Sequence, residues 1–208
     1  MKNIVIIGAG GHSAVIIDII ENMIDSGYEI QIKGLLDDNL DRKEFMKYKV
    51  LDKVENANLY NTENTEYVIA IGSNNIRNKI AEQYKNLKYF TAIHQTATIS
   101  KNVYINEGTV IMPRAVINSN SEIGSHVIIN TGAIIEHDSK IGDFAHISPG
   151  ATLCGGVEVG EKVHIGANAT IIQYKKIGAK TTIGAGSTVI KDICTDVVAV
   201  GSPARIIK

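Results

Sequence analysis

Histidine is the side chain in this sequence best suited to proton transfer near neutral pH. One of the six histidines, His137, lies in the run Ile135-Glu136-His137-Asp138, with an acidic residue on each side. A carboxylate beside an imidazole orients the ring and stabilises its charged form. The run therefore predicts His137 as a general base for acyl transfer to an amine or a hydroxyl, supported by Asp138. The alternative is a surface histidine without a catalytic role.

The other histidines and the cysteines give weaker signals. His146 and His164 are 18 residues apart, and His146 follows His137 by nine residues. These spacings do not reproduce the zinc ligands of γ-class carbonic anhydrases, so we expect no metal. Cys154 has no adjacent histidine that would activate it as a nucleophile. Cys154 and Cys194 fit no metal or redox spacing, and we interpret both as small buried hydrophobes in a reducing cytoplasm.

A second cluster with chemical potential lies near the start of the sequence. The run Gly8-Ala9-Gly10-Gly11-His12-Ser13 resembles the dinucleotide fingerprint, but Ser13 stands where the third glycine belongs, so we expect no NAD. Backbone N–H groups at a helix start favour an anion such as a phosphate. Asp37 and Asp38, after the next strand, are suited to accept hydrogen bonds from a base or a ribose, or form a solvated loop pair.

A repeat of six residues must position the His137 site. Every sixth residue from Ile93 to Val189 is Ile, Leu or Val, at 17 positions without an insertion. This period matches neither an amphipathic helix nor an alternating strand, and it predicts a short strand plus a corner, repeated. Each aliphatic side chain should point inward and stack on its equivalents. We expect the Gly or Asn that often follows it to adopt unusual backbone dihedrals.

Residues 1–90 show a different pattern, which predicts a βαβ unit with a parallel sheet. Short strands are expected at residues 4–7, 30–36 and 67–71, with helices at residues 12–25 and 76–84. The polar segment 56–66 reads as a surface loop. The predicted organisation is a Rossmann-like domain at 1–90 and a repeat domain at 91–208.

Composition excludes several classes of function. The chain has 21 basic and 22 acidic residues and a formal net charge of −1, which argues against a nucleic-acid partner. No run of 18 apolar residues would span a membrane, and the first residues lack a signal-peptide layout, so we expect a cytoplasmic protein.

The hexad pattern resembles the hexapeptide-repeat family, whose fold is the left-handed parallel β-helix with three hexads per coil. The Gly-Ala-Gly-Gly-His-Ser turn, Leu36-Asp37-Asp38, Glu-His-Asp and the tail Val-Gly-Ser-Pro-Ala-Arg at 200–205 resemble a narrower family. This family contains the UDP-4-amino-sugar N-acetyltransferases of bacillosamine-type pathways and the sialic acid O-acetyltransferases of capsule loci.

The resemblance implies a role for individual residues. His137 matches the family's general base, and Asp138 matches its acidic partner. The residues implied to bind the acceptor sugar nucleotide are Gly10, Gly11, His12, Asp37, Asp38 and Asn130. The residues implied to line the acetyl-CoA groove are His146, Ala167 and Ala185. The resemblance also implies a homotrimer with acetyl-CoA between neighbouring β-helices.

We therefore expect an acetyl-CoA-dependent N-acetyltransferase that acts on the 4-amino group of a UDP-linked 4-amino-4,6-dideoxy sugar. O-acetylation of sialic acid is the enzymatic alternative, because Arg77 and Arg114 are available for a carboxylate. The alternative of another class is a nucleotide-binding trimeric scaffold without catalysis.

Overall fold

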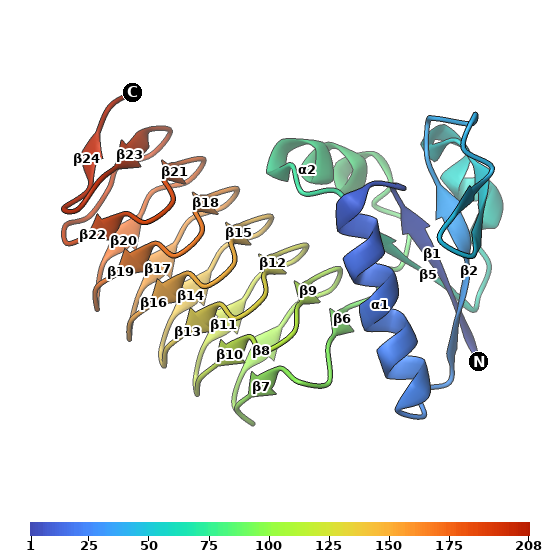
Figure 1. Ribbon diagram of the computed structural model, residues 1–208, viewed down its shortest axis with the longest axis horizontal. Helices are drawn as coiled ribbons and strands as arrows, with labels where there is room; N and C mark the ends of the chain where they lie inside the picture. The colour runs from blue at the N-terminus through green and yellow to red at the C-terminus, as the bar shows by residue number, and fades with distance from the viewer. The chain divides into compact units, whose positions relative to one another are not determined.

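The computed structural model describes all 208 residues, and the chain divides into two compact units, Met1–Gln95 and Thr96–Lys208. The first unit is an α/β domain and the second is a stack of coils without helices (Figure 1). No helix is long and apolar enough to cross a membrane.

The first unit is built on a five-stranded sheet with strand order β3-β4-β2-β1-β5. Its elements are β1 (Lys2–Ile7), α1 (Gly11–Asp25), β2 (Ile30–Leu36), β3 (Glu44–Phe45), β4 (Tyr48–Asp52), the 3-10 helix η1 (Val54–Tyr60), β5 (Thr65–Ile69), α2 (Asn74–Gln83) and β6 (Ala92–Ile93). Strand β1 pairs in parallel with β2 and β5, which confirms the predicted Rossmann-like βαβ arrangement. The carboxyl ends of these three strands therefore meet at one edge of the sheet.

Burial explains why the elements form where the sequence predicts them. Residues 4–7 of β1 are fully buried, as a central parallel strand requires. Helix α1 buries Ile16, Ile19, Ile20 and Met23, as the helical spacing predicts, and it also buries Ile17, whereas Val15, expected on this face, is only half-buried.

The segment between β2 and β5 differs from the prediction. The expected loop at 56–66 holds most of η1 and the start of β5, and the strands β3 and β4 precede it. The pairing between β2 and β4 determines the secondary structure of this segment. Gly34 makes the pairing possible, because a Cβ there would lie 2.8 Å from the carbonyl oxygen of Lys49.

The second unit is a left-handed β-helix with three faces of parallel strands, in the orders β22-β19-β16-β13-β10-β7, β20-β17-β14-β11-β8 and β23-β21-β18-β15-β12-β9, and β24 pairs antiparallel with β23 at the end of the third face. Its two-residue strands are β7 (Thr98–Ile99), β8 (Tyr104–Ile105), β9 (Val110–Ile111), β10 (Val116–Ile117), β11 (Glu122–Ile123), β12 (Ile128–Ile129), β13 (Ile134–Ile135), β14 (Lys140–Ile141), β15 (His146–Ile147), β16 (Thr152–Leu153), β17 (Glu158–Val159), β18 (His164–Ile165), β19 (Thr170–Ile171), β20 (Lys176–Ile177), β21 (Thr182–Ile183) and β22 (Thr188–Val189). The terminal hairpin is β23 (Val198–Val200) and β24 (Arg205–Ile206).

The predicted aliphatic stack forms the core of this unit. Each two-residue strand ends on one of the predicted positions, and residue i pairs with residue i+18 on the next coil, as Ile117 does with Ile135. From Ile111 to Val189 all of these side chains are buried. Each coil therefore adds one layer of apolar side chains, which is the favourable term that drives stacking.

The glycines that follow the aliphatic positions have another role than the one expected. The left-handed backbone lies two residues further on, for example at Asp138 with φ 60°. Gly124 is required instead because a Cβ there would lie 2.8 Å from the backbone nitrogen of Asp143 on the next coil. A Cβ on Gly166 would overlap the backbone nitrogen of Ala185 in the same way. Close approach between coils, rather than a dihedral, selects these glycines.

Candidate active site

The His137 pair lies in the corner that follows β13. Nδ1 of His137 is 2.7 Å from Oδ2 of Asp138, and Nδ2 of Asn120, one coil earlier, donates to Oδ1 of Asp138 at 3.1 Å. The hydrogen bond from His137, and then that from Asn120, lower the pKa of the Asp138 carboxyl. The ionised Asp138 holds the proton on Nδ1, which leaves the lone pair on Nε2 free to accept a proton.

A residue that sequence reasoning missed supports the ring of His137. A Cβ on Gly155, one coil later, would lie 2.7 Å from Cε1 and 2.8 Å from Nε2 of His137. The ring therefore lies against Gly155, and any larger residue would displace it. The signal was present in the sequence, because Gly155 stands 18 residues after His137.

The residues expected to line the acetyl-CoA groove lie on another face of the β-helix. Nδ2 of Asn130 is 3.1 Å from Nε2 of His146, and Oδ1 of Asn130 accepts from the backbone of Thr131 at 2.8 Å. This second bond turns the amide NH₂ of Asn130 toward His146, so Nε2 of His146 is the acceptor. The ring of His146 stacks on that of His164 with centroids 4.8 Å apart, as the 18-residue spacing predicts.

Within one chain, these residues do not meet His137. His146 belongs to β15, whereas His137 follows β13 in a different sheet. Ala167 and Ala185 occupy equivalent places on consecutive coils after β18 and β21, and the N–H of Gly186 donates to the carbonyl of Ala167 at 2.8 Å. The predicted base and the predicted groove residues therefore lie on separate parts of the triangular coil.

In the first unit, the Gly-rich turn is held by two side chains. The N–H of Ala9 donates to Oδ2 of Asp37 at 2.7 Å, and Oδ1 of Asp37 accepts from the N–H of Asn39 at 2.9 Å. Ser13 is buried, and its hydroxyl donates to the carbonyl of Gly8 at 2.9 Å. The serine at the third glycine position thus fixes the turn that precedes α1, and Asp37 shapes this turn from the end of β2.

The half-buried His12 and the buried Arg77 interact electrostatically at the same sheet edge. Nε2 of His12 is buried without a hydrogen-bond partner. Burial first, and the charge of Arg77 second, lower the pKa of His12 to about 4, so the ring is neutral near pH 7. Burial lowers the pKa of Arg77 to about 10.

Arg77 is not available for a sialic acid carboxylate, contrary to the expectation. Its side chain is only 1% exposed, and its guanidinium donates to the carbonyls of Ile71 and Gly72 at 3.0 and 3.2 Å. Arg77 therefore supports the loop between β5 and α2 from inside the unit, and of the two arginines only Arg114 stays exposed.

A pocket of about 490 Å³ opens at this edge of the first unit. Asp38 lines the pocket, and its Oδ1 accepts from the N–H of Val54 at 3.1 Å, which leaves its other oxygen unused. The further lining residues are Gly8, Asp37, Lys53, Val54, Glu55, Ile71, Ile76, Lys79, Ile80, Gln83 and Tyr84. The pocket combines carboxylates, lysines and an aromatic ring, a set suited to a nucleotide.

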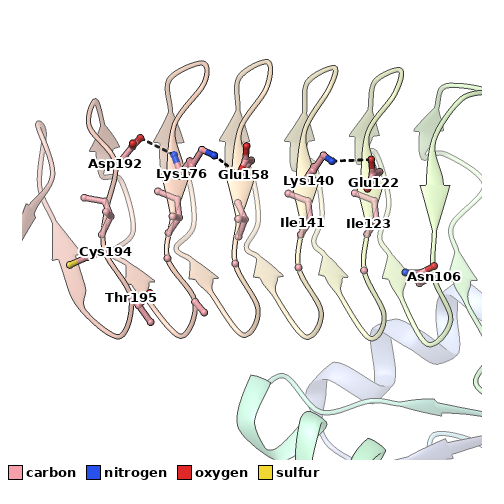
Figure 2. A pocket seen from close by; sticks show the side chains of 18 of the residues that line it. Asn106, Glu122, Ile123, Lys140, Ile141, Glu158, Lys176, Asp192, Cys194 and Thr195 are labelled. Carbon is pink, nitrogen blue, oxygen red and sulfur yellow. Dashed lines mark hydrogen bonds and ion pairs between the residues drawn. The ribbon is translucent and has the colours of Figure 1, made fainter.

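A groove of about 960 Å³ lies elsewhere, on the β-helix, and contains none of the predicted site residues (Figure 2). It runs along the β8 to β20 face, where outward charges alternate: Lys140 pairs with Glu122 at 3.3 Å and Lys176 with Glu158 at 3.0 Å. Size alone therefore does not identify the active site. Cys194 lines this groove and is exposed, contrary to the expectation that both cysteines are buried.

Comparison with known proteins finds a matching family model in each of the two units. Residues 3–84 match the PglD N-terminal domain, and residues 138–173 match the bacterial transferase hexapeptide family. A curated relative, the UDP-N-acetylbacillosamine N-acetyltransferase of Bacillus subtilis, is 42% identical over 116 residues, which is 54% of this chain and about half (52%) of that protein.

Two solved structures match over the whole chain. PerB from Caulobacter crescentus, solved with CoA and GDP-perosamine, is 32% identical with a TM-score of 0.92, covering 100% of this chain and 98% of that one. The acetyltransferase domain of PglB from Neisseria gonorrhoeae, solved with acetyl coenzyme A, is 32% identical with a TM-score of 0.93 and 99% coverage of both chains. This chain therefore belongs to the family of hexapeptide-repeat sugar N-acetyltransferases that carry a PglD-type N-terminal domain.

Proposed function

We propose that this protein transfers an acetyl group from acetyl-CoA to the 4-amino group of a UDP-linked 4-amino-4,6-dideoxy sugar. The observation that carries the proposal is the His137–Asp138 pair, in which an ionised carboxylate holds Nδ1 of a half-exposed ring and leaves Nε2 to accept a proton. Its setting supports the same reaction, because relatives of this architecture include a UDP-N-acetylbacillosamine N-acetyltransferase and proteins crystallised with CoA and GDP-perosamine.

In the proposed mechanism the sugar amine attacks the thioester carbonyl directly. The C–N bond forms, the C–S bond breaks, and CoA leaves as a thiolate. Nε2 of His137 accepts the proton that the amine loses, and Asp138 stabilises the resulting imidazolium. That proton then passes to the thiolate, so no other reactant is needed. Holding both substrates at the corner makes the attack effectively intramolecular.

The acceptor end of the substrate is proposed to lie against the first unit. The turn at Gly10, Gly11 and His12 is proposed to hold the diphosphate through backbone N–H groups at the start of α1, those of Gly11 and His12, because the N–H of Gly10 already donates to Oγ of Ser13 at 3.2 Å. His12 is neutral near pH 7, and its Nε2 is buried without a partner, so we propose that His12 supports the turn from inside rather than through this nitrogen. Asp38 has a free carboxylate oxygen for the uracil, whereas Asp37 already accepts two backbone hydrogen bonds and acts through the turn.

The positions of the acetyl-CoA residues imply an assembly. His146, Ala167 and Ala185, together with the acceptor-binding residue Asn130, lie apart from His137 within one chain. They serve the same reaction when a second copy brings its groove to this corner. We therefore propose a homotrimer, in which Asn130 of one copy lies close to the acetyl group. The predicted cytoplasmic location and the absence of a metal stay predictions.

The test is release of free CoA by the purified protein. Acetyl-CoA is incubated separately with UDP-4-amino-4,6-dideoxy-GlcNAc, with GDP-perosamine and with sialic acid. Fast release with the UDP sugar alone is the expected result. Release with GDP-perosamine instead would keep the reaction and overturn the assignment of uracil to Asp38. Release with sialic acid alone would establish the O-acetylating alternative, and no release at all would favour the scaffold.

A further inference from the structure

One surface of the β-helix links His137 to residues that the proposed mechanism does not use. We call it the His137 corner: residues 136–138, 154–156, 172–174 and 190–192, which follow β13, β16, β19 and β22 on four consecutive coils. Neighbouring coils are about 4.8 Å apart, so the corner runs roughly 14 Å along the β-helix from His137 to Lys191.

Two consecutive glycines, Gly155 and Gly156, form the middle of this corner, and an aromatic ring packs against each of them. The ring of His137 lies against Gly155, as described above. A Cβ on Gly156 would lie 2.5 Å from Cδ1 and 2.8 Å from Cε1 of Tyr174, so the ring of Tyr174 leans back from its own coil onto Gly156. Backbone hydrogen bonds fix the three coils, from Gly156 to His137 at 2.8 Å and from Tyr174 to Gly155 at 2.9 Å.

Tyr174 remains 70% exposed despite this contact. Its φ of 57° is not the unusual feature, because the corner imposes a left-handed backbone at this place on each coil, including Asp138 and Gly156. The unusual feature is a large, mostly solvent-facing ring, two coils or about 10 Å from the predicted base. An exposed aromatic ring beside a candidate active site is suited to contact a ligand.

The polarity of the corner changes with distance from His137. Toward the start of the β-helix the equivalent positions are Asn118 and Asn120, which bond to Glu136 and Asp138. Toward its end the equivalents of Asn118 are Ile172 and Ile190, and those of Asn120 are Tyr174 and Asp192, with the exposed Gln173 and Lys191 between them. Oδ1 of Asp192 already accepts from the backbone N–H of Lys176 at 3.0 Å. The corner therefore carries polar residues bonded to Glu136 and Asp138 on one side of His137, and mostly larger apolar side chains on the other, where it ends at Lys191 and Asp192.

The order of these side chains along the corner matches the order of chemical groups in acetyl-CoA, starting from the thioester. The thioester is the reacting group, the pantetheine arm carries methylene and dimethyl groups, and the phosphates lie at its far end. We propose, resting on the proposed function, that Tyr174 is a donor-recognition residue whose ring packs against the pantetheine arm of acetyl-CoA while the thioester lies at His137. The arm runs toward the C-terminal coils and brings the phosphates within reach of Lys191.

The first experiment measures the Kd of acetyl-CoA by titration calorimetry on the full-length protein. Tyr174→Gly should weaken binding about tenfold, the factor that corresponds to losing roughly 55 Å² of apolar contact at about 25 cal/mol per Å². Glycine suits this backbone, because Gly156 holds the equivalent place one coil earlier with φ 67°. Tyr174→Phe should keep the wild-type Kd, since the ring rather than the hydroxyl makes the contact.

A matched control separates this role from general loss of an exposed ring. Tyr104 is 74% exposed in β8, on the β-helix face that carries the large groove. Tyr104→Ala should leave the Kd of acetyl-CoA unchanged. An equal loss of affinity in this variant would overturn the inference.

The second experiment uses a shortened donor, S-acetyl-N-acetylcysteamine, which carries the thioester but lacks most of the arm. With acetyl-CoA, Tyr174→Gly should raise KM about tenfold at unchanged kcat. With the short donor, wild type and variant should have the same kcat/KM. Equal KM values of wild type and variant for acetyl-CoA, or an equal loss of kcat/KM with both donors, would overturn the inference. The proposed function would stand in either case, because the wild type would still release CoA. A wild type that binds no acetyl-CoA would overturn the proposed function as well.

Discussion

The two units use the same side chain in opposite ways. In the β-helix, His137 is exposed and hydrogen-bonded through Nδ1 to Asp138, a carboxylate that stabilises the imidazolium when the ring accepts a proton. In the first unit, His12 is mostly buried beside Arg77, which favours a neutral ring, with its pKa at about 4. The difference teaches that histidine type alone does not define a role. The surrounding charge and burial decide which histidine accepts a proton and which stays neutral.

The largest expected effect tests the β-helix side of this comparison. His137→Asn removes the proposed base and should lower kcat by a factor of about 10² to 10⁴, the usual contribution of general base catalysis. The Kd of acetyl-CoA should stay unchanged, measured by calorimetry beside steady-state kinetics. His164→Asn is the matched control, since His164 lies in the β15-β18 stack, and it should retain most of the activity. Wild-type kcat in His137→Asn would refute the catalytic assignment.

A smaller effect tests how the ring of His137 is held. Gly155→Ala places a Cβ 2.7 Å from the ring, and an exposed ring moves more easily than backbone. We expect kcat to fall roughly 10- to 100-fold by misplacement of the base, with Tm nearly unchanged. Gly124→Ala should do the reverse, because its Cβ meets the backbone of Asp143 and the coils must separate. Kinetics and thermal unfolding of both variants measure the contrast, and a similar Tm loss in both would contradict it.

The next effect concerns the first unit and its dependence on pH. The pKa of His12 falls from 6.5 to about 4 on folding, so the unfolded chain binds the proton more tightly. The contribution of neutral His12 to the free energy of unfolding is fully present above pH 6.5. It is lost as pH falls toward 4, by roughly 1–3 kcal/mol. Thermal unfolding from pH 7.5 to 4.5 should show a steeper acid loss in wild type than in His12→Gln. Parallel curves for the two proteins would count against a buried neutral His12.

The smallest effect concerns the charges along the large groove. Lys140 and Glu122 are both more than half exposed, and exposed ion pairs contribute at most about 1 kcal/mol. Lys140→Gln should shift the free energy of unfolding by less than that amount and leave kcat unchanged. Urea unfolding and the CoA-release assay measure both quantities. A large loss of activity in Lys140→Gln would place function in the groove rather than at the His137 corner.

The fold was more predictable in the β-helix than in the first unit. A period of six residues placed each aliphatic side chain, because every coil repeats the same local environment. The strands β3 and β4 were not predicted, since β4 forms through its pairing with β2 beside Gly34 and with the two-residue strand β3. The role of the glycines after the aliphatic positions was also missed, because the contact that excludes a side chain comes from a residue about 19 positions away.

The site residues divide in the same manner. The sequence by itself determined the coil, the position of His137 beside Asp138 and the separation of His137 from His146, because these follow from adjacency and from an 18-residue repeat. Only the tertiary structure decided that Asn120 supports Asp138 and that Gly155 carries the ring. It also decided that Asp37 holds the Gly-rich turn, that Arg77 is buried and that Tyr174 leans toward the site. Each of these depends on distances between coils or between loops of the sheet, and those distances are set by packing rather than by local sequence.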